Sequence, residues 1–216
     1  MSETSELLDA IIPKINITGD ISTMKLPDIE QYNYWNLLDN RIICLDGEIT
    51  EWDYNIVKTI IQINIADRGI PRENRKPIVL LINSNGGLLD ITESIVSTIA
   101  MSTTPVWTVN MENALSGGCL IFLAGERRFT TSNSYCMCHA GSGGIQGNYS
   151  ETKEQSKVWD DQIKKMGEYI ISRTNIDAKT YNKYKNKDWY VNAEQQIEFG
   201  FATELLESID QILGAE

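Results

Sequence analysis

Two residues of this 216-residue chain are the first candidates for acid–base or nucleophilic chemistry, Ser116 and the single histidine, His139. A neutral imidazole is the usual proton acceptor for a serine nucleophile. His139 follows an apolar run at residues 135–138 and precedes a glycine-rich stretch, and α/β proteins form their sites at such strand ends. A lone histidine is more often a hydrogen-bonded structural residue, so its type and place make His139 a candidate base and no more.

Ser116 allows two interpretations. Gly117 and Gly118 leave the backbone after it uncovered, so a substrate carbonyl could reach the Gly117 N–H at the positive end of the helix that begins there. Ser116 could equally cap that helix while the glycines allow close packing. The stretch is not the G-x-S-x-G elbow of α/β-hydrolases, because position 114 is alanine.

The turn at residues 85–87, Asn-Gly-Gly, also allows two interpretations. It is either a tight strand–helix connection, or a backbone donor and an edge for a bound peptide. A metal site would have to use Cys136, Cys138 and His139. In a strand Cys138 and His139 point to opposite faces, and no second pair completes a structural zinc site. We expect no metal and no other cofactor.

Composition excludes several classes of function. The formal net charge of −11 argues against nucleic-acid binding and against an anionic membrane surface. No window is apolar enough to span a membrane, and the acidic N-terminal residues do not resemble a secretory signal. We expect a cytoplasmic protein with buried free thiols at Cys44, Cys119, Cys136 and Cys138.

The elements that must position these residues alternate along the chain. Thr50 and Asp53 resemble a capping box before a helix, and residues 68–76 form a charged turn. We expect strands at 41–45, 77–82 and 105–109, with the 85–87 turn ending the second, and a helix carrying Ile91, Ile95 and Ile99. Strand, helix, strand, helix predicts a parallel sheet with right-handed crossovers.

The second half continues this pattern. It contains a strand at 135–138, a long helix from about 151 to 173, and a short helix between a cap pair, Asn192 and Gln195, and Gly200. Residues 1–30 show no sustained period and are interpreted as an irregular arm. No low-complexity linker follows, so we expect one domain over residues 31–216.

Taken together, the motifs resemble those of ClpP, the proteolytic subunit of the Clp proteases. Residues 82–87 are similar to its I-N-S-P-G-G motif, and residues 114–125 to its A-x-S-x-G segment and apolar helix. The resemblance runs from about Arg41 to Leu213. Its other parts are residues 137–139 (M-I-H), 143–147 (G-G-x-Q-G), 188–194 (D-x-F-(L/M)-S-A-x-E) and 198–202 (E-Y-G-L-(V/I)).

The resemblance implies a serine endopeptidase. It makes Ser116 the nucleophile, His139 the general base and Asp188 the residue that orients the imidazole. It also assigns the oxyanion donors to the N–H groups of Gly87 and Gly117. Without the family, Asp160, Asp161 or Asp177 would be equal candidates for the carboxylate.

The resemblance further implies an α/β, ClpP/crotonase-like fold, with βαβ-built parallel sheets and a projecting handle helix at about residues 141–173. Handles would stack two heptameric rings into a homo-oligomeric chamber, fed with unfolded polypeptide by an ATP-dependent AAA+ unfoldase. Substrate peptides would lie extended and pair by strand addition. The residues implied in this pairing are Gly87, Leu88, Leu89, Gly141, Ser142 and Gly143, with Gly144 beside them.

Several departures keep alternatives open. Asn85 replaces the usual proline, and Val79 and Leu81 stand where the family often has aromatic residues at a surface pocket for the ATPase partner. The arm at 1–30 is either a pore-lining segment or a removable propeptide. The remaining alternatives are a phage head-maturation protease of the same chemistry, a catalytically silent ring subunit, and an acyl-CoA enzyme of the crotonase fold, which would need a basic site that this acidic chain lacks.

Overall fold

The computed structural model describes residues 28–144 and 146–213, which belong to two compact units, Met1–Ile42 and Ile43–Glu216. The described part of the first unit contains α2 (Ile29–Asp39), where the Asp28 carboxylate caps the helix by accepting the Gln31 N–H at 2.8 Å. The last two residues of the predicted irregular arm are therefore helical. The rest of that arm, residues 1–27, lies outside the described residues, and the boundary at residue 31 stays a prediction.

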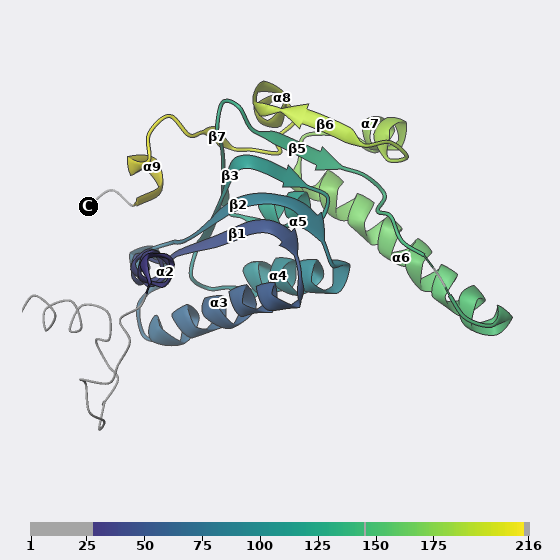
Figure 1. Ribbon diagram of the computed structural model, residues 1–216. Coiled ribbons are helices and arrows are strands. Elements are labelled where there is room, and N and C mark those ends of the chain that lie inside the picture. Colours follow the sequence, from purple (N-terminus) through teal and green to yellow (C-terminus); the bar gives the residue numbers. More distant parts are fainter. Residues whose placement is uncertain (1–27, 145, 214–216) are drawn as a thin grey trace, which may run out of the picture. The chain divides into compact units, whose positions relative to one another are not determined.

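The sheet is mixed and mainly parallel, which confirms the predicted α/β fold class (Figure 1). Its main path runs β1-β2-β3-β4-β7, and β5 pairs in parallel with β3 and antiparallel with β6. β3 thus serves two branches, because its first half pairs with β4 and its last residues pair with β5. The strands are β1 (Ile42–Ile49), β2 (Ile78–Gly87), β3 (Val106–Leu115), β4 (Arg127–Thr130), β5 (Tyr135–Cys138), β6 (Trp189–Asn192) and β7 (Glu204–Leu205).

Helices of the first half cover one side of this sheet. α3 (Tyr54–Ala66) follows the short 3-10 helix η2 (Glu51–Asp53), and the predicted cap forms, since the Asp53 carboxylate accepts the Thr50 N–H at 2.7 Å. α3 and α4 (Leu89–Met101) run side by side along β1 and β2 in Figure 1. α5 (Gly117–Ala124) packs against β2, β3 and α4 and is almost wholly buried.

Both central strands are longer than predicted. The run at 77–82 continues as strand through Gly87, so the Asn-Gly-Gly turn does not end it, and the run at 105–109 continues to Leu115. The turn stays in the sheet because Gly86 and Gly87 adopt φ values of 92° and 155°, which are strained for other residues. The predicted charged turn at 68–76 contains the 3-10 helix η3 (Arg72–Asn74).

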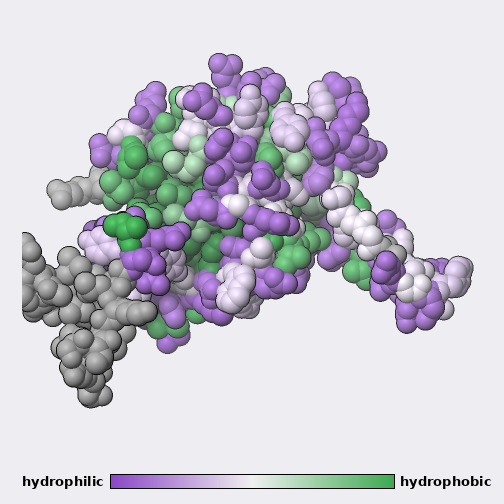
Figure 2. All heavy atoms as spheres, viewed as in Figure 1, coloured by the Kyte–Doolittle hydropathy of each residue, from purple (hydrophilic) through white to green (hydrophobic). Residues whose placement is uncertain are grey.

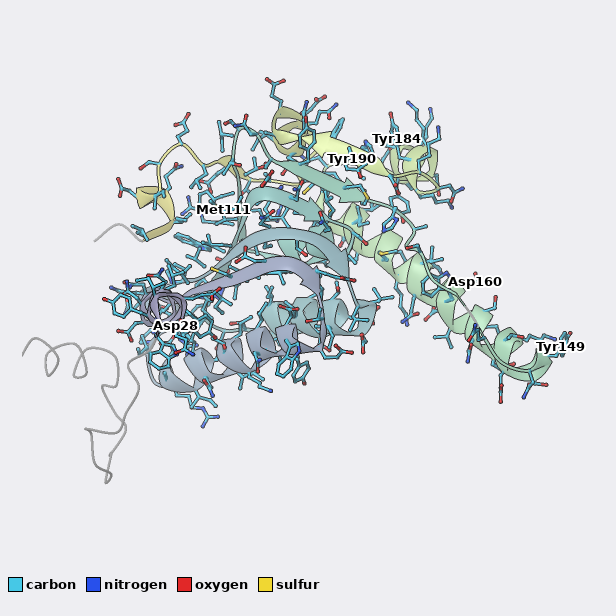
Figure 3. All side chains as sticks on the ribbon, in the orientation of Figure 1. Asp28, Met111, Tyr149, Asp160, Tyr184 and Tyr190 are labelled. Atoms are coloured by element: carbon cyan, nitrogen blue, oxygen red, sulfur yellow. The ribbon has the colours of Figure 1, made fainter. Side chains whose placement is uncertain are left out.

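The second half is dominated by α6 (Tyr149–Arg173), which confirms the predicted long helix and projects from the sheet in Figure 1. Figure 3 marks its free end with Tyr149 and its middle with Asp160. The predicted cap pair also forms, because Gln195 N–H donates to the Asn192 side chain at 2.9 Å. The remaining helices are α7 (Ala178–Tyr184), α8 (Ala193–Glu198) and α9 (Asp210–Leu213).

Three further expectations concern burial. Cys119, Cys136 and Cys138 are buried free thiols, whereas Cys44 is half-buried. Val79, expected at a surface pocket, is only 2% exposed, because the sheet is covered at this position. Within the described ranges, no helix has both the length and the apolar character needed to cross a bilayer.

Candidate active site

The pairing of β3 with β5 brings Ser116 and His139 together. Leu115 pairs with Met137 in these parallel strands, so Ser116 and the residues that follow Met137, Cys138 and His139, lie at the same edge of the sheet. The Ser116 N–H donates to the Met137 carbonyl at 2.8 Å. The Ser116 hydroxyl oxygen then lies 2.7 Å from His139 Nε2, within hydrogen-bond reach of a general base.

The antiparallel pairing of β5 with β6 brings the carboxylate. Cys138 pairs with Trp189, so His139 and Asp188, the next residues outward on the two strands, face each other. Asp188 Oδ1 lies 3.5 Å from His139 Nδ1, on the opposite side of the ring from Ser116. The Asp188 side chain is 63% exposed and the His139 side chain 20%, so the carboxylate sits at the wet edge of the site.

The other three candidate carboxylates have different surroundings. Asp161 pairs with Lys165 at 2.6 Å, and Asp177 caps α7 by accepting the Thr180 N–H at 2.7 Å. These hydrogen bonds from Thr180 lower the pKa of Asp177 below its usual value. Asp160 is exposed on α6. Within the described ranges, Asp188 is the carboxylate that lies against the His139 ring.

Ser116 has a strained backbone. Its φ of 53° and ψ of −119° lie outside the regions that residues with a side chain prefer, and such strain persists only where the surroundings enforce it. The Ser116 carbonyl accepts the N–H groups of Cys119 at 3.0 Å and Leu120 at 3.3 Å, which start α5. Ser116 occupies the N-cap position of α5, but its side chain makes no cap hydrogen bond, so the hydroxyl does not cap the helix.

A bulge between β2 and β3 sets the glycine turn against Ser116. Ile82 pairs with Asn110 and Ser84 with Ala114, so β3 spends two more residues than β2 between these pairs. The new register places Gly86 beside Ser116, where a Cβ atom on Gly86 would lie 2.6 Å from the Ser116 Cβ. Only glycine fits there.

Ser84 braces this turn from below. Its hydroxyl donates to the Gly47 carbonyl at 2.6 Å, in a partly buried contact, and accepts the Gly86 N–H at 3.1 Å, in a buried one. Gly87 lies so close to β1 that a Cβ would come within 2.2 Å of the Ile49 carbonyl oxygen. The backbone that leads to the predicted donor at Gly87 is therefore fixed by β1 and by Ser84. The motif alone gave no sign of this brace.

Gly117, the second predicted donor, is the first residue of α5. N–H groups at this position have no partner within their own helix and point along the positive end of its dipole. Gly87 and Gly117 both line the same groove as Ser116 and His139. The arrangement can therefore place two backbone donors beside a serine nucleophile.

The groove lies between α4, α5 and α6 and encloses about 840 Å³. Of the predicted substrate-binding residues, Gly87, Leu89, Gly141 and Ser142 line it, whereas Leu88 and Gly143 do not among the residues the structure describes. The Leu88 N–H donates to Ile49 O at 3.0 Å, and its carbonyl accepts from Thr92 N and Oγ1 at 3.0 and 2.8 Å. Leu88 can then meet a peptide only through its side chain, which is 39% exposed.

Trp159 of α6 supports the other wall, a role that sequence analysis missed. A Cβ on Gly143 would lie 3.0 Å from Trp159 Cη2, and one on Gly141 would lie 3.7 Å from Cζ2. The indole therefore lies directly over the glycine backbone of residues 141–143 and also lines the groove. The helical spacing of Trp159 indicated an apolar face but could not say what that face covers.

The thiols beside the site are poor nucleophiles. Burial raises the pKa of Cys138 well above its usual value, so its sulfur stays protonated. A hydrogen bond with Cys136, followed by burial, raises the pKa of Cys119. Within the described ranges, no three histidine, cysteine or acidic side chains gather where they could hold a metal ion.

Comparisons with families and with individual proteins point to the same family. The family model for Clp protease matches residues 28–209. ATP-dependent Clp protease proteolytic subunit 1 of Rhodopirellula baltica is 32% identical over 173 residues, which are 79% of this chain and 74% of that protein. Proteolytic subunit 2 of Treponema denticola is 30% identical over 171 residues, 78% of this chain and 82% of that one.

A solved structure shows the same fold. A single-residue mutant of ClpP1 from Listeria monocytogenes superposes with a TM-score of 0.71 at 22% identity, covering 83% of this chain and 99% of that one. At this identity the likeness concerns the fold alone. It confirms the predicted ClpP-like architecture with its projecting helix.

Proposed function

This chain belongs to the Clp protease family, and from that premise we propose that it is a self-compartmentalised serine endopeptidase that cleaves unfolded polypeptides to short peptides. The observation that carries the proposal is the 2.7 Å contact between Ser116 Oγ and His139 Nε2 at the mouth of a peptide-sized groove. In this proposal Ser116, His139 and Asp188 act as a catalytic triad.

The first half of the reaction acylates Ser116. His139 Nε2 accepts the hydroxyl proton as Oγ attacks the scissile carbonyl, and Asp188 stabilises the imidazolium through Nδ1. The developing oxyanion receives hydrogen bonds from the N–H groups of Gly87 and Gly117. The imidazolium then protonates the leaving amine, and the first peptide product departs.

The second half runs through water. A water molecule attacks the acyl carbon while His139 accepts its proton, and the same two N–H groups stabilise the oxyanion that forms. Ser116 recovers its proton from the imidazolium, and the second peptide product leaves. No cofactor takes part in either half.

Peptide binding is proposed as strand addition between Gly87 and the segment Gly141–Gly143, with the side chains of Leu88 and Leu89 beside it. Recognition of backbone in this way suits a broad substrate range. The two walls are held by different means, since β1 and Ser84 fix one and Trp159 supports the other. Both walls are therefore built before a peptide arrives.

The wider assignment follows from the family. We propose a homo-oligomer, two stacked heptameric rings joined through α6, that works in the cytoplasm with an AAA+ unfoldase. Val79 and Leu81 stand where the family often has aromatic residues at the pocket for this partner, and here Val79 is buried and Leu81 is half-buried. The surface offered to the unfoldase therefore differs from the usual one. A phage head-maturation protease would share the same chemistry. The contact between Ser116 and His139 favours an active enzyme over a silent ring subunit.

The test is reaction with a fluorophosphonate probe, followed by mapping of the labelled peptide. We expect labelling at Ser116 and none in Ser116→Ala, while Ser132→Ala, a change in an exposed turn, labels like the wild type. Cleavage of a fluorogenic peptide should follow the same pattern. A wild-type chain that does not react would overturn the proposal.

A parallel incubation tests the enclosed site. A stable folded reporter should survive, because native domains lie about 5–15 kcal/mol below their unfolded states and rarely present an extended segment. The chain also lacks a G-x-x-x-x-G-K-[ST] phosphate loop with which to couple unfolding to ATP. Efficient degradation of the reporter without nucleotide or partner would contradict the chambered protease.

A further inference from the structure

α6 is fastened to α5 by two side chains of its last two turns. The Tyr169 hydroxyl donates to the Leu120 carbonyl at 3.1 Å. Arg173 Nε donates to the Leu123 carbonyl at 2.7 Å, and one terminal nitrogen of the same guanidinium donates to Gly125 O at 2.7 Å and Ala124 O at 3.5 Å. We call Tyr169 and Arg173 the α6 clamp.

The clamp acts on the helix that begins at the proposed nucleophile. α5 is one short helix from Gly117 to Ala124, and Leu120 N–H donates to the carbonyl of Ser116 itself. Leu120 thus links the two contacts, because its carbonyl accepts from Tyr169 and its N–H, in the preceding peptide group, donates to Ser116. Arg173 fixes the opposite end of the same helix, where a cation also matches the helix dipole.

Ser116 needs such support because its backbone is strained. A residue with φ of 53° and ψ of −119° relaxes unless its neighbours hold it. The Met137 carbonyl holds the N–H side of Ser116, and the first turn of α5 holds its carbonyl side. Movement of α5 along its axis would carry Ser116 Oγ away from His139 Nε2, because His139 directly follows β5 and is not part of α5.

We propose that Tyr169 and Arg173 are positioning residues, which fix α5 so that Ser116 keeps reactive geometry toward His139. The inference rests on the proposed function, because it assigns these residues to the acylation of Ser116. It also gives the two parts of α6 different roles. The last two turns serve the chemistry, the middle of α6 lines the groove, and the free end at Tyr149 projects from the sheet (Figure 1).

The experiment is active-site titration of the full chain with the fluorophosphonate probe, which separates the number of reactive sites from the rate constant at each site. Tyr169→Phe removes one oxygen, Arg173→Gln removes the charge, and Arg173→Lys keeps a cation with fewer donors. The matched controls are Tyr34→Phe on α2, where the tyrosine is 51% exposed, and Lys164→Gln on α6, where the side chain is 75% exposed.

We expect Tyr169→Phe to lower the acylation rate constant about 3- to 10-fold and Arg173→Gln about 10- to 100-fold, with Arg173→Lys between Arg173→Gln and the wild type. The number of titrated sites and the peptide KM should stay within about twofold of wild type, because Arg173 is not among the residues that line the groove and Tyr169→Phe removes only one oxygen from its wall. Both control variants should react at the wild-type rate. A purely structural role would instead lower the number of sites and leave the rate at each remaining site intact.

Three outcomes overturn the inference. Variants that acylate at the wild-type rate per site, in a wild type that does label at Ser116, would overturn the clamp and leave the proposed function standing. A wild type that does not label at all would overturn the proposed function and the clamp with it. Loss of sites without loss of rate would make Tyr169 and Arg173 structural only.

Discussion

Helices α5 and α6 pack against each other but are stabilised in opposite ways. Every residue of α5 except Ala124 is buried, whereas of the 25 residues of α6 only Gly167 and Ile170 are. α5 carries no charged side chain at all. The free end of α6 is coated mainly by hydrophilic side chains in Figure 2.

The difference shows where each helix gets its stability. An isolated helix as short as α5 would not form in water, so its packing in the core holds it and Ser116 in place. α6 supports itself with an Asn148–Glu151 capping box and with charged pairs such as Lys157–Glu154 and Lys165–Asp161, both at 2.6 Å. Changes around α5 should therefore affect chemistry, and changes on the free part of α6 should affect assembly and binding.

The largest expected effect comes from removing the base that faces α5. His139→Ala should lower peptide turnover by about 10⁴-fold or more, because the chain has no second imidazole to replace it. Steady-state cleavage of a fluorogenic peptide measures the loss. Circular dichroism and the melting temperature serve as the control for folding. A variant that kept more than a tenth of wild-type turnover, a barrier change of only ~1.4 kcal/mol, would contradict the triad.

The next effect concerns the turn that packs against Ser116. Gly86→Ala should lower kcat by about 10²- to 10³-fold, since the new Cβ would displace Ser116 and the adjoining oxyanion backbone. Gly69→Ala is the matched control. Gly69 has nearly the same φ, 86° against 92°, but open space around its Cβ position.

The control isolates the collision from the backbone strain that both variants share. Gly69→Ala should lose some stability and keep its turnover, because alanine at positive φ costs only about 1 kcal/mol. Equal losses of kcat in the two variants would mean that strain alone, and not the approach to Ser116, explains the need for glycine.

The same contrast explains what sequence analysis could predict. Periodicity and caps identified α3, α4, α6 and α8, because the first three carry regular apolar positions and Thr50 and Asn192 sit at helix starts, whereas α2, α7 and α9 were not predicted. Residue type alone singled out His139. Tertiary contacts could not be predicted from the sequence, because the register between strands leaves no local trace in the chain.

The bulge after Ile82 is the clearest case. It shifts β2 by two residues against β3, keeps every side chain on its own face, and delivers Gly86 to Ser116. The alternation of apolar and polar residues along a strand is the same with or without this bulge. For the same reason the residues alone left four aspartates open, and the β5–β6 register brings Asp188 to His139.

A smaller effect is expected at the free end of α6. Sedimentation of the wild type at micromolar concentration should find a large homo-oligomer, because the exposed apolar side chains of α6, Val158 at 60% and Tyr149 at 80%, have no cover within the described part of the unit. Tyr149→Asp should weaken assembly by about 10- to 100-fold, as expected from uncovering one aromatic side chain worth ~1.5–3 kcal/mol. Aspartate suits the first helical position, so α6 itself should stay folded.

The control on the same helix is Glu154→Gln, which breaks an exposed pair with Lys157 worth about 0–1 kcal/mol at most. Its sedimentation should match the wild type. A wild type that sediments as a monomer with full peptidase activity would contradict the chamber, whatever the variants do.

The smallest effect tests the middle of α6, where the two behaviours meet. Trp159 belongs to the largely exposed helix, yet its indole covers the glycine backbone of residues 141–143 and lines the groove. Trp159→Phe keeps an aromatic ring but removes the outer six-membered part that lies over Gly143. It should raise the peptide KM by about 2- to 10-fold, the range of one aromatic contact, and change kcat by less than about twofold.

Trp52→Phe is the matched control, because Trp52 is 81% exposed and lies outside the groove, so its KM should not change. The split between KM and kcat decides what Trp159 does. A raised KM with unchanged kcat means that the indole supports peptide binding and that the chemistry depends on α5 and its clamp. A fall in kcat at constant KM would instead mean that the middle of α6 helps to position Ser116. The part of α6 that serves the chemistry would then extend from its last two turns back to Trp159.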